Sequence, residues 1–157
     1  MIMELKGDLL KYDVDAIGHC ANCFCTMGSG IAKQIREKFP QAFSVDSKTR
    51  SGDIEKFGKF SCAEITQPNI KTTVKFVYNL YGQFYYGRDI RKLNYESIYT
   101  ALEAMRMDCV SKPVRNIGLP KNMGCNLAGG SWKVVESMIH DIFDESPFNI
   151  YIVEYTK

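Results

Sequence analysis

The chain has 157 residues, a formal net charge of +2, 45% hydrophobic residues and 24% charged residues. This length suits one domain, residues 1–157, whose core needs no disulfides, and the composition excludes a disordered chain. Lysines and arginines are scattered among the acids without a basic block, which argues against a nucleic-acid partner and leaves a small anionic ligand open.

The N-terminal segment and the cysteines indicate where the protein resides. Residues 1–19 carry acids among the apolar positions, a pattern that fits neither a signal peptide nor a membrane span. We therefore expect a cytoplasmic protein with no membrane partner. In that compartment the six cysteines are expected to be free thiols rather than disulfides.

Short apolar runs alternate with segments of helical period, and this alternation predicts an α/β fold. In the first half of the chain, residues 2–6 and 15–21 are predicted strands. A helix from Gly30 to Phe39 carries Ile31, Ile35 and Phe39 on one face and is expected to stop at Pro40, and the more polar residues 41–52 can hold a second helix.

The second half of the chain continues the alternation. Residues 59–65 and 73–81 are predicted strands, followed by a long loop from Gly82 to Leu93. A helix is predicted from Asn94, its N-cap, to Ser111. The remaining predicted elements are a short buried strand at 115–120, a glycine-containing loop at 121–130, a helix from Trp132 to Phe143 and a strand at 149–155.

The cysteines suggest two kinds of chemistry that their context disfavours. His19, Cys20, Cys23 and Cys25 have the spacing of half a zinc site, but no second C-x-x-C or H-x-x-x-H completes it, so buried thiols are favoured and no metal is expected. The segment Cys109–Arg115 has the C-x5-R spacing of cysteine phosphatases. It ends a predicted helix instead of opening one, contains Pro113 and has no glycine, which favours a chance match.

Two glycine-containing loops lie at strand-to-helix junctions, where an open α/β sheet binds its ligands. They are residues 22–30, "NCFCTMGSG", and residues 121–130, "KNMGCNLAGG". Their glycines let backbone amides approach an anion beside the positive end of a helix. The chain has neither a P-loop nor a dinucleotide G-x-G-x-x-G, so we expect two loops that together hold a diphosphate, although glycines that serve only as turns remain the alternative.

Three stretches, "KGDLLKYDVDAIGHCAN", "MGSGIAKQIREKFP" and "LPKNMGCNLAGGSW", resemble the macrodomain family of ADP-ribose-binding proteins over nearly the whole chain. The stretch from His19 to Ala42 is similar to the branch that contains the yeast-type ADP-ribose 1″-phosphate phosphatases and the terminal ADP-ribose glycohydrolases. The resemblance implies a three-layer α/β/α domain with a mixed, mostly parallel six-stranded sheet. It also implies ADP-ribose or a 1″-derivative as ligand, no cofactor and a monomeric state.

The resemblance also implies roles for single residues. Asp8 and Leu9 would meet the adenine, Asn22 the distal ribose, and Tyr155 would pack on the base. An acceptor for the amine and an aromatic cover are what adenine recognition requires, although Asp8 could instead cap a turn and Tyr155 could be an ordinary chain terminus. The remaining implied ligand contacts are Gly28, Ser29, Gly30, Ile31, Gln83, Gly124, Cys125, Asn126, Leu127 and Ala128.

Macrodomains divide into ADP-ribose readers and hydrolases. The glycohydrolase branch uses a lysine in the loop after the fourth strand and an aspartate in the second glycine loop. This chain departs at both places, because the first loop begins "YGQFYYG" and the second reads "GCNLAGG" with no acid. His19 remains as the candidate catalytic residue, because an imidazole can exchange a proton near neutral pH, although a buried structural histidine is the alternative. We expect metal-independent hydrolysis of ADP-ribose 1″-phosphate. Hydrolysis of O-acetyl-ADP-ribose or protein-linked ADP-ribose and a non-catalytic reader stay open.

Overall fold

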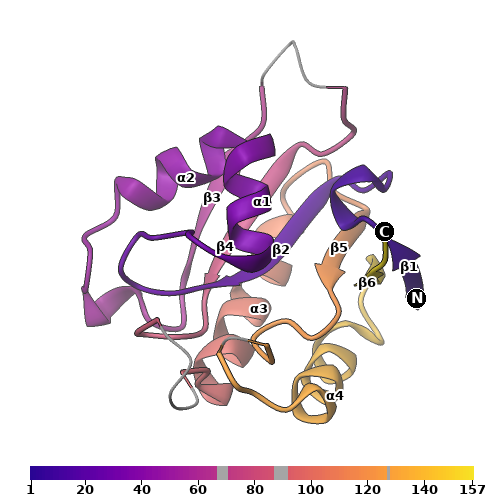
Figure 1. Ribbon diagram of the computed structural model, residues 1–157. Helices are drawn as coiled ribbons and strands as arrows, with labels where there is room; N and C mark the ends of the chain where they lie inside the picture. Colours follow the sequence, from indigo (N-terminus) through magenta and orange to yellow (C-terminus); the bar gives the residue numbers. More distant parts are fainter. Residues whose placement is uncertain (67–70, 87–91, 127) are drawn as a thin grey trace.

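The structure is a computed structural model that describes residues 1–66, 71–86, 92–126 and 128–157. The described residues form a six-stranded sheet and four α-helices (Figure 1). The strands are β1 (Ile2–Gly7), β2 (Ala16–Ala21), β3 (Phe60–Glu64), β4 (Phe76–Tyr81), β5 (Asn116–Pro120) and β6 (Asn149–Tyr155). The helices are α1 (Gly30–Lys38), α2 (Pro40–Ser47), α3 (Tyr95–Cys109) and α4 (Trp132–Phe143).

The sheet has the strand order β1-β6-β5-β2-β4-β3. All neighbouring strands run parallel except β3, which pairs antiparallel with β4 at one edge. The mixed, mostly parallel sheet expected from the sequence is therefore confirmed. Because parallel strands end at the same edge of a sheet, the loops after β2, β4, β5 and β6 gather on one side of the molecule.

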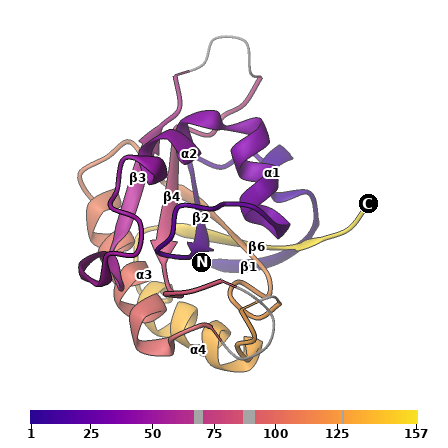
Figure 2. The same ribbon diagram turned by 60° about the vertical axis from the view of Figure 1, so that its left-hand side comes forward.

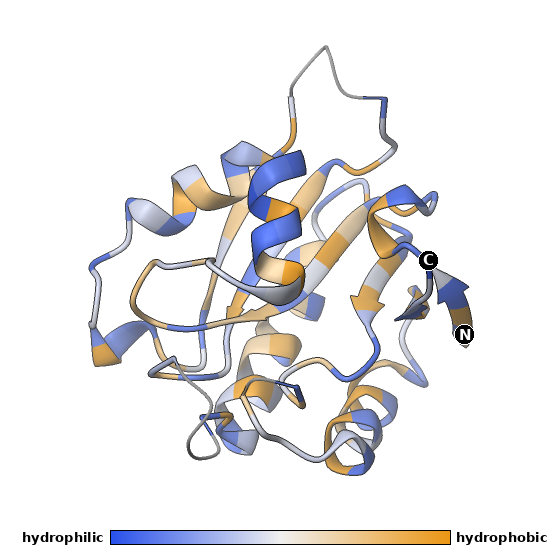
Figure 3. Cartoon of the chain, viewed as in Figure 1, coloured by the Kyte–Doolittle hydropathy of each residue, from blue (hydrophilic) through white to orange (hydrophobic). Residues whose placement is uncertain are grey.

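Helices cover both faces of the sheet and make the three layers (Figures 1 and 2). One core, which includes Ile35, Phe39 and Val77, lies between the sheet and the α1 and α2 layer. A second core, which includes Leu102 and Ile139, lies under α3 and α4. The inner strands β2, β4 and β5 are mainly apolar (Figure 3), as expected for strands buried on both faces of a sheet.

The junction between α1 and α2 differs from the sequence expectation. Pro40 does not simply end the first helix: α1 ends at Lys38, and Pro40 occupies the first position of α2. Proline is favoured there because its fixed φ suits a helix start and its missing N–H would have no helical partner. Asn94 caps α3 as expected, and its Oδ1 accepts from the Ser97 N–H at 2.9 Å.

A short 3-10 helix, η1 (Leu9–Lys11), follows β1 and packs on β5. A Cβ added to Gly118 of β5 would lie 2.6 Å from Cδ1 of Leu9, so this strand needs glycine where η1 approaches. Among the described residues, no helix is long and apolar enough to cross a membrane.

Candidate functional site

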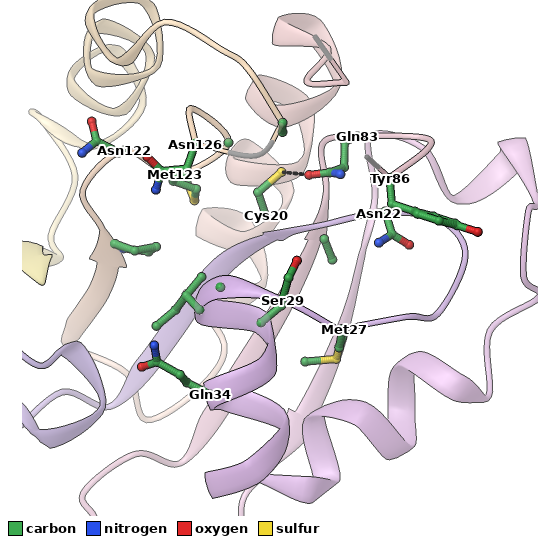
Figure 4. A pocket seen from close by; sticks show the side chains of 18 of the residues that line it. Cys20, Asn22, Met27, Ser29, Gln34, Gln83, Tyr86, Asn122, Met123 and Asn126 are labelled. Carbon is green, nitrogen blue, oxygen red and sulfur yellow. Dashed lines mark hydrogen bonds between the residues drawn. The ribbon is translucent and has the colours of Figure 1, made fainter. Parts of the chain in front are cut away.

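A cavity of about 710 Å³ opens where the loops after the parallel strands meet. Figure 4 shows Ser29, Met27 and Gln34, from the first glycine loop and α1, on one side, with Asn122, Met123 and Asn126 of the second loop opposite. Gln83 and Tyr86 reach the cavity from the segment after β4 (Figure 4). Leu9 and Tyr155 contribute to its wall from η1 and the end of β6.

The structure brings most of the predicted ligand-binding residues together. Those that line this one cavity are Leu9, Asn22, Gly28, Ser29, Gly30, Ile31, Gln83, Gly124, Asn126, Ala128 and Tyr155. They come from segments far apart in the chain, and the parallel sheet gathers them at one edge.

Three predicted residues do not line the cavity, and a fourth, Leu127, lies outside the described residues. Asp8 caps η1, where its Oδ1 accepts from the Leu10 N–H at 3.0 Å, which is the capping role that the sequence left open for this residue. The Cys125 thiol donates to the Met123 carbonyl at 3.3 Å. The third residue is His19.

His19 is completely buried in β2 beside Asn79 of β4. Its Nε2 lies 2.6 Å from Asn79 Oδ1, while the Asn79 amide donates to the Ala42 carbonyl and to Ser61 Oγ, both at 3.0 Å. Because Asn79 Oδ1 is the acceptor, His19 Nε2 carries the proton. Burial lowers the pKa of His19 to about 4, so its ring is neutral at neutral pH.

These surroundings differ from those that the predicted catalytic role of His19 requires. A general acid or base must reach the proton that it transfers, whereas the ring of His19 lies away from the cavity lining. The neighbouring residue Cys20 lines the cavity instead. Successive side chains of a strand point to opposite faces, so Cys20 and His19 cannot both face the same side of the sheet.

The first glycine loop presents an open helix end to the cavity. Ser29 is the N-cap of α1, but its side chain makes no capping hydrogen bond, and no acid lies in the first turn of the helix. Asn22 is held within the loop, because its amide donates to Thr26 Oγ1 at 2.6 Å and its Oδ1 accepts from the Phe24 N–H at 2.8 Å. Free N–H groups at a helix N-terminus favour an anion.

The second glycine loop closes on itself. The Gly130 N–H donates to the Gly124 carbonyl at 2.9 Å, and the Leu93 N–H donates to the Ala128 carbonyl at 3.0 Å. Gly124 has a φ of +72°, in the left-handed region that glycine adopts without strain. The Leu93 side chain fills the space beneath both glycines, so a Cβ on either would collide with it.

Few charged groups line the cavity. Among its described lining residues only Lys121 and Asp46 are charged types, and Lys121 Nζ lies 3.8 Å from Glu154 Oε2. Anion binding here would therefore depend mainly on backbone N–H groups and helix α1.

The cysteines are buried or partly buried thiols. All six are free. Burial raises the pKa of Cys20 to about 12 and the pKa of Cys125 to about 11, so neither is an activated nucleophile. In the described part of the chain no group of three His, Cys, Asp or Glu residues is arranged to hold a metal ion.

The sequence predictions missed part of the lining, including Thr26, Gln34, Tyr86, Asn122 and, most notably, Asp46. Asp46 becomes visible only in the structure. It follows Ala42 by four residues, so the two share a helix face, and that face is buried. An acid on the buried face of a helix is unusual unless it is paired or functional.

Comparisons with known proteins give relatives along nearly the full chain. The uncharacterized 17.5 kDa protein of the tk-vs intergenic region of enterobacteria phage T4 is 28% identical, over 99% of this chain and 97% of its own. The ADP-ribose glycohydrolase OARD1 of Homo sapiens is 27% identical, over 96% of this chain and 90% of its own. The ADP-ribose 1″-phosphate phosphatase of Candida albicans is 24% identical, over 98% of this chain and 100% of its own.

The fold and a family model agree with these matches. The macrodomain of Mycobacterium tuberculosis DarG superposes with a TM-score of 0.80 at 20% identity, and the match covers 100% of this chain and 99% of that one. The model of the Macro domain matches residues 19–139, which include both glycine loops, strands β4 and β5 and the end of β2. Because the family model matches most of the chain, the chain belongs to the Macro domain family.

Proposed function

We propose that this protein binds ADP-ribose in the cavity and hydrolyses ADP-ribose 1″-phosphate to ADP-ribose and phosphate. The observation that carries the proposal is the uncapped start of α1 at Ser29, which opens into the cavity between the two glycine loops. A phosphate fits such a helix end without needing a cationic side chain. The Candida albicans relative, a 1″-phosphate phosphatase, supports this choice of substrate.

The proposed ligand lies along the cavity. Its adenine occupies the end formed by Leu9 and Tyr155, its diphosphate lies between the two glycine loops, and its distal ribose lies near Asn22 and Gln83. Tyr155 is 59% exposed, so its ring is available to cover a base.

The phosphatase activity is tested by incubating the protein with ADP-ribose 1″-phosphate and measuring inorganic phosphate. Calorimetry with ADP-ribose tests binding separately. Phosphate release together with binding supports the proposal. Binding without phosphate release would make the protein a reader, and no binding at all would overturn both activities.

A second candidate is hydrolysis of the bond between the distal ribose and a macromolecule. The similarity to human OARD1, an ADP-ribose glycohydrolase, favours this candidate. In this chain Gln83 stands in the segment after β4 and lines the cavity, and it cannot attack the ribose as an amine would. Release of ADP-ribose from an ADP-ribosylated peptide, measured beside phosphate release, distinguishes the two reactions.

Replacing Gly28 with alanine is expected to weaken ADP-ribose binding about tenfold without lowering stability. An added Cβ would find no neighbour closer than the Thr26 carbonyl at 3.8 Å, so the free protein accommodates it. In the complex the methyl group would occupy space that a phosphate oxygen needs to reach the loop amides, at a cost of about 1.4 kcal/mol for a tenfold effect.

Calorimetry and thermal unfolding of the Gly28→Ala variant check this prediction. Lys33→Ala is the control, because this exposed residue lies on the same helix outside the cavity lining. Unchanged affinity in Gly28→Ala would show that the diphosphate does not approach the first loop.

A further inference from the structure

Asp46 is the only acidic side chain among the described residues that line the cavity. It lies on α2, behind the first glycine loop, where its backbone carbonyl accepts from the Cys25 thiol at 3.2 Å. The residue is only 1% exposed. Cys25 directly precedes Thr26 and Met27, which line the cavity, so Asp46 adjoins the loop assigned above to the diphosphate and ribose.

The two carboxyl oxygens of Asp46 have different surroundings. Oδ1 accepts from the Tyr81 hydroxyl at 2.6 Å, while Oδ2 is buried and has no hydrogen-bond partner among the described residues. A buried acceptor without a partner costs about 1–3 kcal/mol. Such an atom in a residue that lines the cavity indicates a partner that belongs to the functional state, either a water molecule or a ligand group.

A directed chain of hydrogen bonds ends at Oδ1. Asn79 donates to Ser61 Oγ at 3.0 Å, and Ser61 Oγ lies 2.7 Å from the Tyr81 hydroxyl. Tyr81 uses its only hydrogen on Asp46, so Ser61 must donate to Tyr81. His19 stands at the far end of the chain, where its Nε2 donates to Asn79 at 2.6 Å.

This chain fixes the orientation of the carboxyl group. It joins β2, β4, β3 and α2, and every member except Asp46 donates toward the carboxylate. Donors aligned in this way strengthen one another and hold Oδ1 in place, which leaves Oδ2 as the oxygen that can act. His19 thus lies four hydrogen bonds away from the cavity residue that its chain supports.

We propose that Asp46 is the general base of the reaction and that Oδ2 receives the proton of the hydrolytic water. This assignment rests on the proposed phosphatase function. The water oxygen forms a bond to phosphorus while its proton passes to Oδ2. The bond between phosphorus and the ribose oxygen breaks, its electron pair stays on that oxygen, and the proton held by Asp46 passes to it. The products are ADP-ribose and phosphate.

The surroundings of Asp46 hold its pKa above the ordinary value of an aspartate carboxyl group. Burial raises the pKa of Asp46, while the Tyr81 hydrogen bond and the nearby Lys56 ammonium oppose that rise. The other titratable groups around it are the thiols of Cys23 and Cys25. Because the base must be ionised, the rate falls as the pH drops through the pKa of Asp46.

The test compares two tyrosine–aspartate pairs on opposite faces of the sheet. In the cavity pair Tyr81 donates to Asp46, and in the matched pair Tyr78 donates to Asp108 at 2.6 Å, outside the cavity lining. The variants are Asp46→Asn and Tyr81→Phe, with Asp108→Asn and Tyr78→Phe as controls. Phosphate release from ADP-ribose 1″-phosphate is measured from pH 4 to 9, and ADP-ribose binding is measured by calorimetry.

Asp46→Asn is expected to lower kcat about 100-fold or more while ADP-ribose affinity stays within about threefold. Tyr81→Phe removes a donor that stabilises the carboxylate, so the acidic limb of its pH profile should move to higher pH. The two control variants should keep the wild-type kcat and pH profile. If Tyr81 had only a structural role, Tyr81→Phe would lower the stability of the protein without moving the acidic limb of the pH profile.

The assignment is overturned if Asp46→Asn keeps kcat within about fivefold of the wild type, or if the pH profile of Tyr81→Phe does not move. Should Asp46→Asn fail to fold, the profile of Tyr81→Phe decides the question. If both the wild type and Asp46→Asn release phosphate, the role of Asp46 is refuted and the phosphatase function is retained. A wild type that binds ADP-ribose without releasing phosphate refutes the phosphatase function and the base with it.

Discussion

Replacing Gly130 with alanine is expected to lower the melting temperature by about 4–8 °C and to weaken ADP-ribose binding about tenfold. The added Cβ would lie 2.3 Å from Leu93 Cδ2 and 2.8 Å from the Gly124 carbonyl oxygen. The leucine side chain can rotate, but the carbonyl belongs to the backbone that closes the second loop. Overpacking of this kind costs about 2 kcal/mol.

Binding should weaken because the loop must open to admit the methyl group. The hydrogen bond from Gly130 N–H to the Gly124 carbonyl would lengthen or break, and Gly124, Asn126 and Ala128 would leave their places in the cavity wall. Differential scanning calorimetry and titration with ADP-ribose measure the two effects. The control is Ser131→Ala, because this exposed side chain makes no capping hydrogen bond. An unaltered melting temperature would contradict the packing described for this loop.

The stability of the protein is expected to fall by about 3 kcal/mol between pH 6.5 and pH 4 because of His19 alone. Its pKa is 6.5 in the unfolded chain and about 4 in the buried site. Between these values the unfolded state binds the proton and the folded state does not. The contribution of the neutral His19 to stability is therefore fully present above pH 6.5 and is lost as the pH falls toward 4. Urea unfolding at intervals across this range measures the change.

The variant His19→Gln isolates this contribution. A glutamine amide can still donate to Asn79 Oδ1 but does not titrate. The loss of stability between pH 6.5 and pH 4 should therefore be smaller in the variant than in the wild type by about 3 kcal/mol. His140→Gln is the control, because that histidine has a side chain 44% exposed and pairs with Asp144 on the surface. If wild type and His19→Gln show the same pH dependence, the histidine is not buried in the neutral form.

Much of the fold could be predicted from the sequence because its elements are short and strongly patterned. The strands at 15–21 and 149–155 and the helix from Trp132 lie within a residue or so of their predicted bounds. The predicted strand at 73–81 begins later, at Phe76, since only residues from there on pair along both neighbours. The role of Pro40 at the start of α2 was not predicted, because a proline is compatible both with the end of one helix and with the first position of the next.

The parts of the site that depend on the course of the backbone could be predicted from the sequence. The parts that depend on the direction of a side chain could be predicted less well. Glycine loops at the ends of parallel strands must meet, which is why Gly28 and Gly124 line one cavity. His19 lies in a strand that is buried on both faces, so alternation does not reveal which side chains point toward the ligand. Asp46 comes from a helix that no glycine motif marks, and only its burial and free oxygen make it visible.

The cavity lies at one edge of the sheet that separates the two cores. Met27 of the first loop belongs to the core under α1 and α2, and Met123 of the second loop belongs to the core under α3 and α4. A ligand held by both loops therefore couples two packing units that could otherwise open independently. Local unfolding on either face would first have to release the ligand, so occupancy of one small site would slow the opening of both halves of the molecule.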